Sequence, residues 1–554
     1  MTATPRSRHG FGPQRSETVP RTVWLLVAAV PVAFLAVFFA DPIVTILVRG
    51  LTEGSALDVI RRRSTGRLVA FTVGQAAASA VLSLVAGLPA AWAVARVDLP
   101  GRRLVRALLV VPFVLPTLVV GAALQATFER VGVDGTEGFH LERTVAAVLL
   151  AHMVLNVAVV VRVVGAHWAL LDPRAEEAAR VLGASRLRVL REVTLPRLGP
   201  AILSATGIVF LFCFTSFGVI LTVGGPGRPT LETEIWRHAT QRTDLATATA
   251  LALLQMVVVV ALVVVVGVAE RRAGAGAVVR RPVPPRRPVT ARQWLGVGAA
   301  LAPAAALVLV PVGVLVERSL AVGDGYGLGH FRALGDETGT GLSVAPLDAV
   351  RTSLTYAVAA MLIAVVVGGL ASVVVAHAGR GPGRALDVLL MVPLGTSAVT
   401  LGFGLLVALD EPPLDLRSSR VIVPIAQALV GMPFVVRSLV PALRSIDPRL
   451  RDAATVLGAS PARARWEVDV PLVGRTVLVG AAFAFAVSLG EFGATSFLAR
   501  PDAPTVPTAM FRLLGQPGAA LRGQAMALGV VLAALTVASV LVIERLRPRD
   551  ALGW

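Results

Sequence analysis

The 554-residue sequence contains no lysine, so all 52 of its basic residues are arginine. A nucleotide-binding P-loop requires the pattern G-x-x-x-x-G-K-[ST], in which the lysine side chain reaches the phosphates. Without lysine, the chain can form no such loop. If ATP drives this protein, another chain must bind the ATP.

Cysteine and charged residues are also scarce. The single cysteine, Cys213, excludes an internal disulfide and a cysteine-rich metal site. Only 16% of the residues are charged, whereas soluble domains average about 25%. Apolar runs long enough to cross a bilayer, at roughly 20 residues per helix, recur along the chain. The sequence therefore predicts an all-α polytopic membrane protein surrounded by a lipid bilayer.

The net charge of +18 does not indicate a nucleic-acid partner. Most arginines lie between the apolar runs, where the positive-inside rule places them on cytoplasmic loops. The seven histidines are scattered, and no paired carboxylates or nucleophile motif stand at a spacing typical of catalysis. We therefore expect no nucleic-acid binding, no catalytic residues and no metal site.

The apolar runs form two sets of six, which predict twelve transmembrane helices. The first set covers residues 22–48, 67–95, 104–127, 144–168, 198–224 and 244–269, and the second covers 294–317, 351–378, 384–408, 421–443, 473–498 and 523–544. Between them, Pro, Gly and seven arginines favour a flexible basic linker. The predicted organisation is a tail over 1–21, transmembrane domains over 22–269 and 294–545, a linker over 270–293, and a tail over 546–554.

The two sets are copies of each other. "DPR" at 172–174 returns at 447–449, and "VLGAS" at 181–185 returns at 456–460, both 275 residues later. Nearer the N-terminus the offset is 281, as when Val111-Pro112 returns at 392–393. Because each set has an even number of helices, the halves are expected to be parallel repeats related by an axis along the membrane normal.

Charge sets the expected orientation. The two tails and the linker are basic and fall on one side, which is therefore expected to be cytoplasmic. The repeated polar stretches at 172–196 and 447–471 follow the fourth and tenth helices and share that side. Arg61, Arg62 and Arg63 argue against this orientation, because they fall on the outer side.

Each repeated stretch is predicted to form a short helix, a sharp turn and a second short helix. In the first copy, Asp172 is an N-cap, Pro173 opens the helix, and Gly183 suits the left-handed residue that closes it. Ser185 can cap the second helix, which Pro196 is expected to end. The second copy carries the equivalents Asp447, Pro448, Gly458, Ser460 and Pro471.

The spacing of this stretch is specific. "EAA" at 177–179 is followed by Gly183 and then by "VTLP", and "DAA" at 452–454 repeats the pattern without a gap. The pattern resembles the EAA loop of ABC importer permeases, which couples the permease to its ATPase. The resemblance assigns this role to Glu177, Ala178, Ala179, Gly183, Asp452, Ala453, Ala454 and Gly458. Asp452 departs from the usual glutamate, so weaker docking is expected there. The alternative is an amphipathic loop that lies on lipid headgroups.

The resemblance implies a type I ABC importer permease in a bacterial inner membrane. Two loops on one chain imply two ATPase subunits for a single permease chain, together with an extracytoplasmic binding protein. The permease itself is expected to be no enzyme and to bind no cofactor, since ATP and Mg²⁺ belong to the ATPase.

The segments after each repeated stretch are expected to line the translocation path. Residues 210–237 and 483–512 interrupt apolar helices with small and polar residues. The candidate path and gate residues are Thr215, Ser216, Gly218, Ser488, Gly490, Glu491 and Gly493. A charged group at the centre of a membrane helix costs about 2.5–3.5 kcal/mol, so Glu491 is not expected to face lipid. It either faces the path near a gate, or is a structural residue bonded to a neighbouring helix or to a helix N-terminus.

The same segments are similar to the ferric-iron and thiamine group of fused permeases. "CFTSFGVILTVGGPGRPTLE" is similar to the thiamine type, and "SLGEFGATSFLA" is similar to the iron type. The expected substrate is iron(III), with thiamine close behind. Molybdate or sulfate is an alternative, because such permeases carry a comparable G-E-F-G-A. A transporter of the major facilitator type is a remote alternative, since that type has no EAA loop.

Overall fold

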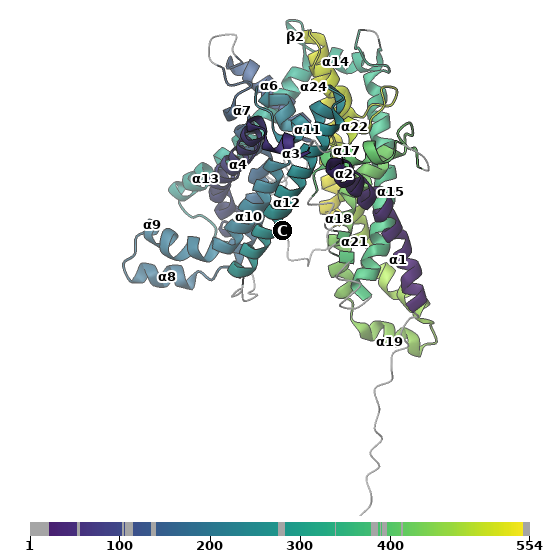
Figure 1. Cartoon of the computed structure of the whole chain (residues 1–554). Coiled ribbons are helices and arrows are strands. Elements are labelled where there is room, and N and C mark those ends of the chain that lie inside the picture. Colours follow the sequence, from purple (N-terminus) through teal and green to yellow (C-terminus); the bar gives the residue numbers. More distant parts are fainter. Residues whose placement is uncertain are drawn as a thin grey trace, which may run out of the picture.

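The computed structural model is an all-helical bundle apart from one short hairpin in the described residues. The structure describes residues 21–52, 56–101, 105, 115–134, 140–225, 227–274, 283–337, 339–377, 386–387, 389–390, 396–410 and 414–546. The hairpin pairs β1 (Ala321–Val322) with β2 (Gly325–Tyr326). Figure 1 shows two helical arms that join at one end and diverge toward the other.

The elements follow the predicted repeat. Those of the first half are α1 (Arg21–Leu35), η1 (Ala36–Ala40), α2 (Asp41–Thr52), α3 (Ala56–Arg61), α4 (Arg63–Arg96), α6 (Thr117–Val131), α7 (Val145–Leu170), α8 (Arg174–Val181), α9 (Arg186–Val189), η2 (Leu190–Thr194), α10 (Leu195–Phe214), η3 (Ile220–Gly224), α11 (Leu231–Thr240) and α12 (Leu245–Gly274).

Those of the second half are α13 (Ala291–Leu320), β1, β2, α14 (Gly329–Arg332), η4 (Ala333–Gly335), α15 (Pro346–His377), α17 (Ala398–Ala408), α18 (Ile422–Arg444), α19 (Pro448–Val456), α20 (Pro461–Ala464), η5 (Arg465–Asp469), α21 (Val470–Gly490), α22 (Thr495–Leu498), α23 (Val506–Leu514) and α24 (Ala519–Leu546).

Ten helices in the described ranges are long and apolar enough to cross a membrane. They correspond to ten of the twelve predicted spans, which confirms an all-α polytopic protein. The third span of each half is represented by a shorter helix, α6 or α17. Most of the remainder of these two spans, including the repeated Val-Pro pair at 111–112 and 392–393, lies outside the described residues.

Three prolines lie inside helices that continue past them, although Pro196 and Pro471 were expected to end theirs. Pro42, Pro196 and Pro471 each follow a wide π-helical turn, and the helix continues through it. In each case the residue before the proline donates its N–H to the carbonyl five residues back. The wider turn removes the clash that a proline ring makes with the preceding turn of an α-helix. The prediction that Pro196 and Pro471 end the second short helix was therefore wrong.

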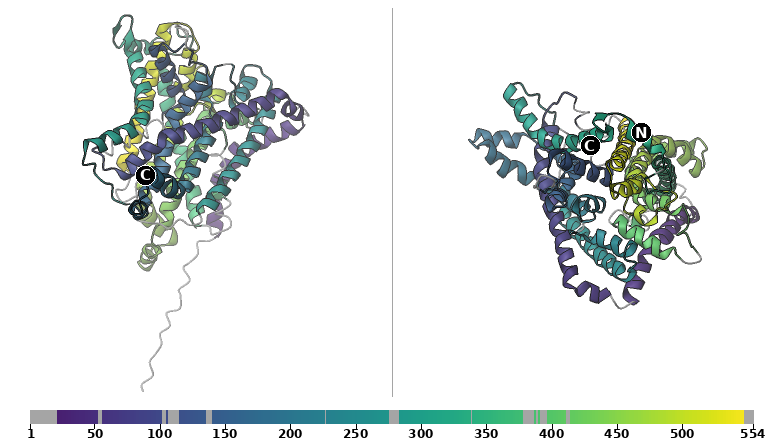
Figure 2. Two further views of the ribbon diagram at one scale, coloured as in Figure 1. Left: turned by 90° about the vertical axis from the view of Figure 1, so that its left-hand side faces the viewer. Right: turned by 90° about the horizontal axis from the view of Figure 1, so that it is seen from above.

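The two halves exchange their first helices. Helix α1 packs against α15 and α2 against α17, so the first helix of the chain covers the second half. Helix α13 packs in turn against α4 and α6 of the first half. The two views of Figure 2 show how the helices of the halves interlock. Each half therefore carries one helix of the other when the arms move.

Equivalent glycines make equivalent close contacts in the two halves. A Cβ atom on Gly87 would lie 2.7 Å from Val160, and one on Gly368 would lie 3.4 Å from Val435. The offsets of 281 and 275 residues found in the sequence thus hold in three dimensions. A side chain at Gly87 would clash with the neighbouring helix, whereas one at Gly368 would lie in close contact with it.

The close packing of the helices can be tested at Gly402. Its Cβ would lie 2.5 Å from the Cα of Ala494, a backbone atom that cannot rotate away. We expect Gly402→Ala to destabilise the protein by about 1–3 kcal/mol, because overpacking forces the backbones apart. Thermal unfolding in detergent measures the change. Gly369→Ala, which meets no atom within 4 Å, is the control, and equal melting temperatures for the two variants would contradict this packing.

Candidate functional site

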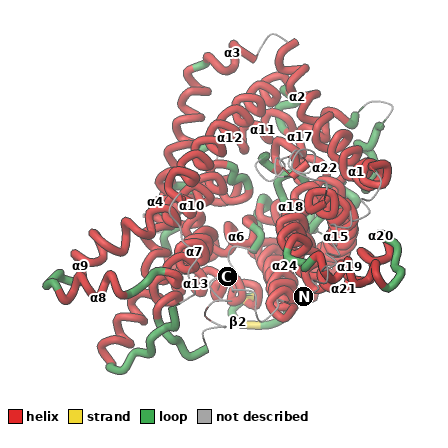
Figure 3. The backbone as a smooth tube through the Cα atoms, turned by 90° about the horizontal axis from the view of Figure 1, so that it is seen from below, coloured by secondary structure: helices red, strands yellow, loops and turns green. Residues whose placement is uncertain are grey.

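The repeated stretches at 172–196 and 447–471, here called the first and second repeated loops, lie at the same end of the molecule. Helices α8 and α9 form the first loop, and α19 and α20 form the second. Figure 1 places both at the end where the arms diverge, and Figure 3 shows them on opposite sides of that end. Parallel repeats produce this arrangement, because each half ends its fourth long helix on the same side.

The caps and turns of the two loops agree with the sequence. Asp172 and Asp447 each accept a hydrogen bond from the backbone N–H two residues later, at 3.0 Å. Gly183 and Gly458 both have φ of +86°. This left-handed conformation favours glycine, so the sharp turn between the two short helices depends on these residues.

A second contact fixes the angle between the short helices, with different chemistry in each loop. In the first loop, Thr194 donates a hydrogen bond to Glu176 at 2.9 Å. In the second loop, Arg451 and Asp469 stand at the equivalent positions and form an ion pair at 2.8 Å. Equivalent positions thus join the short helices in both loops, through a hydrogen bond in one and an ion pair in the other.

Both loops present the same face. Glu177, Ala178 and Gly183 are exposed in the first loop, as are their equivalents Asp452, Ala453 and Gly458. Ala179 and Ala454 are half-buried. The predicted coupling residues therefore gather on one surface of each loop, where a partner's backbone can approach the alanines closely.

The sequence reasoning overlooked an apolar pair at the tip of each loop. Val181 and Leu182 are each 87% exposed, and Val456 and Leu457 are 85% and 88% exposed. These side chains stand among charged residues, away from the apolar surfaces of the long helices. The valine-leucine pair beside a glycine that closes a helix was the available signal, and exposed apolar residues gathered in a patch are typical of interaction surfaces.

The helices that follow the loops lead without a break to the middle of the molecule. Residues Arg186–Phe214 form one apolar helix of 29 residues, and Arg465–Gly490 form one of 26. The first ends before Thr215, Ser216 and Gly218, and the second reaches Ser488 and Gly490 at its end. The predicted interruption of these apolar helices is confirmed.

Four aromatic rings meet where the two helices end. Phe217 stacks on Phe492, its equivalent in the other half, with ring centroids 5.3 Å apart. Trp236 and Phe511, which are also equivalents, meet edge to face at 5.9 Å. This central aromatic cluster thus joins the halves through two pairs of equivalent residues.

Three glycines close to the cluster lie where a side chain would come too near a neighbouring residue. A Cβ atom on Gly218 would lie 2.4 Å from the hydroxyl of Thr117, and one on Gly493 would lie 2.9 Å from Ala398. A Cβ atom on Gly490 would lie 3.1 Å from the side chain of Pro116 in the other half. The candidate path residues are therefore tightly packed in this structure.

Both carboxylate oxygens of Glu491 accept hydrogen bonds from backbone N–H groups in the turn that follows it. One oxygen accepts the backbone N–H of Ala494 at 2.7 Å, and the other accepts that of Thr495 at 3.0 Å. The side chain is 6% exposed. Both N–H groups lie at the start of the short helix α22. Glu491 is therefore bonded to a helix N-terminus, which was one of the two alternatives that the sequence left open.

A second buried acid, not singled out from the sequence, joins the halves. Glu232 at the start of α11 accepts hydrogen bonds from Gln255 at 2.6 Å and from Ser397 of the second half at 2.7 Å. Its side chain is fully buried. Ser397 also caps α17, since it accepts the N–H groups of Val399 and Thr400. Its neighbours in "RPTLETEIWR" are polar and charged, so no pattern in the sequence marked this acid as buried.

We expect Glu232→Gln to destabilise the folded protein by about 1–3 kcal/mol. The amide can accept at only one of its two polar atoms, so one buried donor, on Gln255 or Ser397, loses its partner. Thermal unfolding in detergent measures the loss. Glu192→Gln is the control, because that carboxylate is 62% exposed and pairs only with Arg188. An unchanged melting temperature for Glu232→Gln would contradict the role of this contact.

Ion pairs gather at the end opposite the repeated loops. Arg522 pairs with Glu129 of the first half at 3.0 Å, and Arg130 pairs with Glu317 of the second at 3.4 Å. The guanidinium groups of Arg420 and Arg500 lower the pKa of Asp502 to about 2. Links between the halves at this end therefore consist of exposed charges, whereas Glu232 and the aromatic cluster join the interior.

Comparison with known proteins decides the family. Residues 67–274 and 364–549 each match the family described as the binding-protein-dependent transport system inner membrane component. The chain belongs to this family of ABC importer permeases. It contains the family's domain twice, which confirms the resemblance drawn from the two loops and places the protein in a membrane.

Several relatives show how far the likeness extends. The thiamine transport system permease protein ThiP of Brucella abortus (strain 2308) is 27% identical over 98% of both chains. The putative 2-aminoethylphosphonate permease PhnV of Salmonella typhimurium is 28% identical over 43% of this permease and 89% of its own length. The sulfate permease CysT of the same organism is 33% identical over 30% of this permease and 62% of its own length.

Proposed function

We propose that this permease is the membrane-spanning subunit of an ATP-driven importer, and that its two repeated loops receive the motion of two ATPase subunits. The observation that carries the proposal is the pair of loops with equal caps, equal turns and equally exposed valine-leucine tips. One chain supplies both loops, so one permease chain assembles with two ATPase subunits. A binding protein on the outer side delivers the substrate.

The mechanism follows from the continuity of two helices. ATP binding draws the ATPase subunits together, and the repeated loops move with them. Because Arg186–Phe214 and Arg465–Gly490 are unbroken, each loop moves the far end of its helix as a lever. The predicted path residues lie at those ends, so motion at the loops reaches the path directly.

The central aromatic cluster is the proposed closure of the path. The four rings of Phe217, Trp236, Phe492 and Phe511 join the two halves between the lever ends. Rotation of the halves separates equivalent rings and opens a passage. In the present structure the loops lie apart and the rings of Phe217 and Phe492 stack, which supports a closed state of this cluster.

The proposal also assigns the orientation of the permease in the membrane and the subunit that binds ATP. The loops, both termini and the linker at 270–293 face the cytoplasm, since these segments carry the excess of arginine. The permease contributes no bond chemistry and holds no cofactor. ATP and Mg²⁺ bind to the ATPase subunits. The tails at 1–21 and 546–554 and the two transmembrane domains at 22–269 and 294–545 divide the chain as the sequence indicates.

Thiamine is the first candidate substrate. A relative that matches 98% of this permease is named as a thiamine permease, and the segment at 213–232 is similar to the thiamine type. Iron(III) is the second candidate, on the likeness of the segment at 488–499 alone. The sulfate and phosphonate relatives match less than half of the chain.

Uptake into proteoliposomes tests the proposal. The permease is reconstituted with its ATPase and binding protein and supplied with thiamine, iron(III), sulfate or 2-aminoethylphosphonate in turn. We expect ATP-dependent uptake of thiamine and none without the ATPase. Uptake driven by an ion gradient alone would contradict an ATP-driven importer, and uptake of iron(III) instead would reverse the order of candidates.

A further inference from the structure

The linker re-enters the described structure beside the first repeated loop. Val283 donates its backbone N–H to Ala169 at 2.9 Å, and Arg286 donates to Arg96 at 2.9 Å. The backbone N–H of Asp98 donates to the carbonyl of Arg286 at 3.1 Å. Three backbone bonds therefore fix residues 283–286, here called the linker strand, against the ends of α4 and α7.

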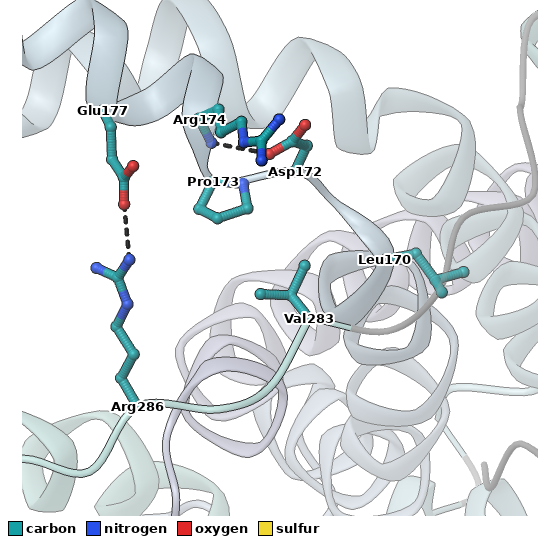
Figure 4. A pocket seen from close by; sticks show the side chains of 7 residues that line it. All are labelled: Leu170, Asp172, Pro173, Arg174, Glu177, Val283 and Arg286. Carbon is teal, nitrogen blue, oxygen red and sulfur yellow. Dashed lines mark hydrogen bonds and ion pairs between the residues drawn. The ribbon is translucent and has the colours of Figure 1, made fainter.

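The side chain of Arg286 reaches the first repeated loop. Its guanidinium donates to the carboxylate of Glu177 at 2.6 Å, as Figure 4 shows. The two residues border an open pocket of about 370 Å³, which the end of α7, the start of α8 and the linker strand enclose. Glu177 is the acidic residue of the EAA pattern, so the linker strand holds the group expected to meet the ATPase.

The second repeated loop has no such neighbour. Asp452 is the equivalent of Glu177, and it makes no ion pair or hydrogen bond within the described part of the chain. The linker can serve only one loop, because it occurs once, between the halves. Within the described residues, an ion pair to the acidic residue of the pattern is thus found in the first loop and not in the second.

We propose that the linker strand masks the first coupling surface, and that an ATPase subunit docks there by displacing Arg286 from Glu177. The inference rests on the proposed function. The side chains of Arg286 and Glu177 are 77% and 47% exposed, so the pair can open without unfolding. The second loop, whose Asp452 is free of such a contact, offers its surface without a competitor. Assembly therefore proceeds through two unequal docking steps.

The competing explanation is that the strand only guides the chain into α13. Thr290 caps that helix four residues after Arg286, so the strand has this task as well. The backbone bonds serve the guiding role, whereas the Arg286 side chain does not contribute to it. Side-chain replacement at Arg286 therefore separates masking from guiding.

The test measures binding of the ATPase subunit that co-purifies with the wild-type permease, using full-length permease in nanodiscs. Arg286→Ala is compared with wild type and with Arg287→Ala. The control removes the same charge from a neighbouring exposed residue. We expect roughly two- to fivefold tighter binding for Arg286→Ala only, as is typical of an exposed ion pair. The gain should disappear near 1 M salt, where the screening length falls to about 3 Å.

A double-mutant cycle with Glu177→Gln identifies the cause. If Arg286 competes for Glu177, replacing Arg286 has no further effect once the carboxylate is gone. A wild-type permease that binds no ATPase would refute the proposed function itself. Normal binding with no difference between Arg286→Ala and Arg287→Ala, or weaker binding for Arg286→Ala, would overturn the masking proposal. Equal melting temperatures confirm that the variants are folded.

Discussion

Replacing Gly183 and Gly458 together by proline is expected to reduce substrate-stimulated ATP hydrolysis of the assembled importer by at least about tenfold. Both glycines have φ of +86°, and the ring of proline fixes φ near −65°. Proline also removes the N–H that each glycine donates to the carbonyl three residues earlier, at 2.9 Å. Each loop must then abandon its turn, at a cost of about 1–3 kcal/mol per strained residue. A tenfold loss corresponds to about 1.4 kcal/mol and lies within this range.

The control for this variant uses a second pair of glycines one repeat apart. Gly199 and Gly474 lie in the lever helices just beyond the loops, and a Cβ atom on either meets nothing within 4 Å. Their replacement by alanine should leave stimulation unchanged. Stimulation that survives in the double-proline variant would mean that the shape of the loops does not transmit the motion.

Shortening Phe217 and Phe492 together to alanine is expected to raise passive efflux of substrate by at least about tenfold. These rings stack across the halves at 5.3 Å and are 5% and 4% exposed. Their removal opens the proposed closure of the path, since truncated core positions refill only partly. Efflux of preloaded radiolabelled thiamine from proteoliposomes without ATP measures the leak.

A matched aromatic pair separates closure from stability. Phe434 and Phe483 also stack, with centroids 6.3 Å apart, but both belong to the second half and lie away from the central aromatic cluster. Alanine at these two positions should reduce the melting temperature without raising efflux. Equal efflux from the two double variants would place the closure elsewhere.

The sequence predicted the fold well where patterns repeat. Hydrophobic runs located the long helices, and the offsets of 281 and 275 residues are those between Gly87 and Gly368 and between their contacts Val160 and Val435. The loop turns were predictable because an aspartate cap and a glycine at fixed spacing leave few backbone conformations. The family followed from the same loops.

Other features depend on contacts that sequence spacing does not reveal. A π-helical turn carries the helix past Pro196, although proline normally ends a helix. The partner of Glu232 is a serine 165 residues away in the other half. The bond from Arg286 to Glu177 depends on where the linker strand docks. Each required the packing of distant segments, which hydrophobic period and local propensity do not encode.

The most direct test of the account is the distance between the repeated loops during the ATPase cycle. Cys213 is the only cysteine, and serine stands at its equivalent, position 488, so Cys213→Ser provides a background for labelling. Spin labels at Arg180→Cys and Thr455→Cys, equivalent exposed positions on the two loops, report their separation in nanodiscs with the ATPase and binding protein. We predict a shorter distance when ATP is trapped than without nucleotide. An unchanged distance in a complex that hydrolyses ATP would contradict the coupling role of the loops.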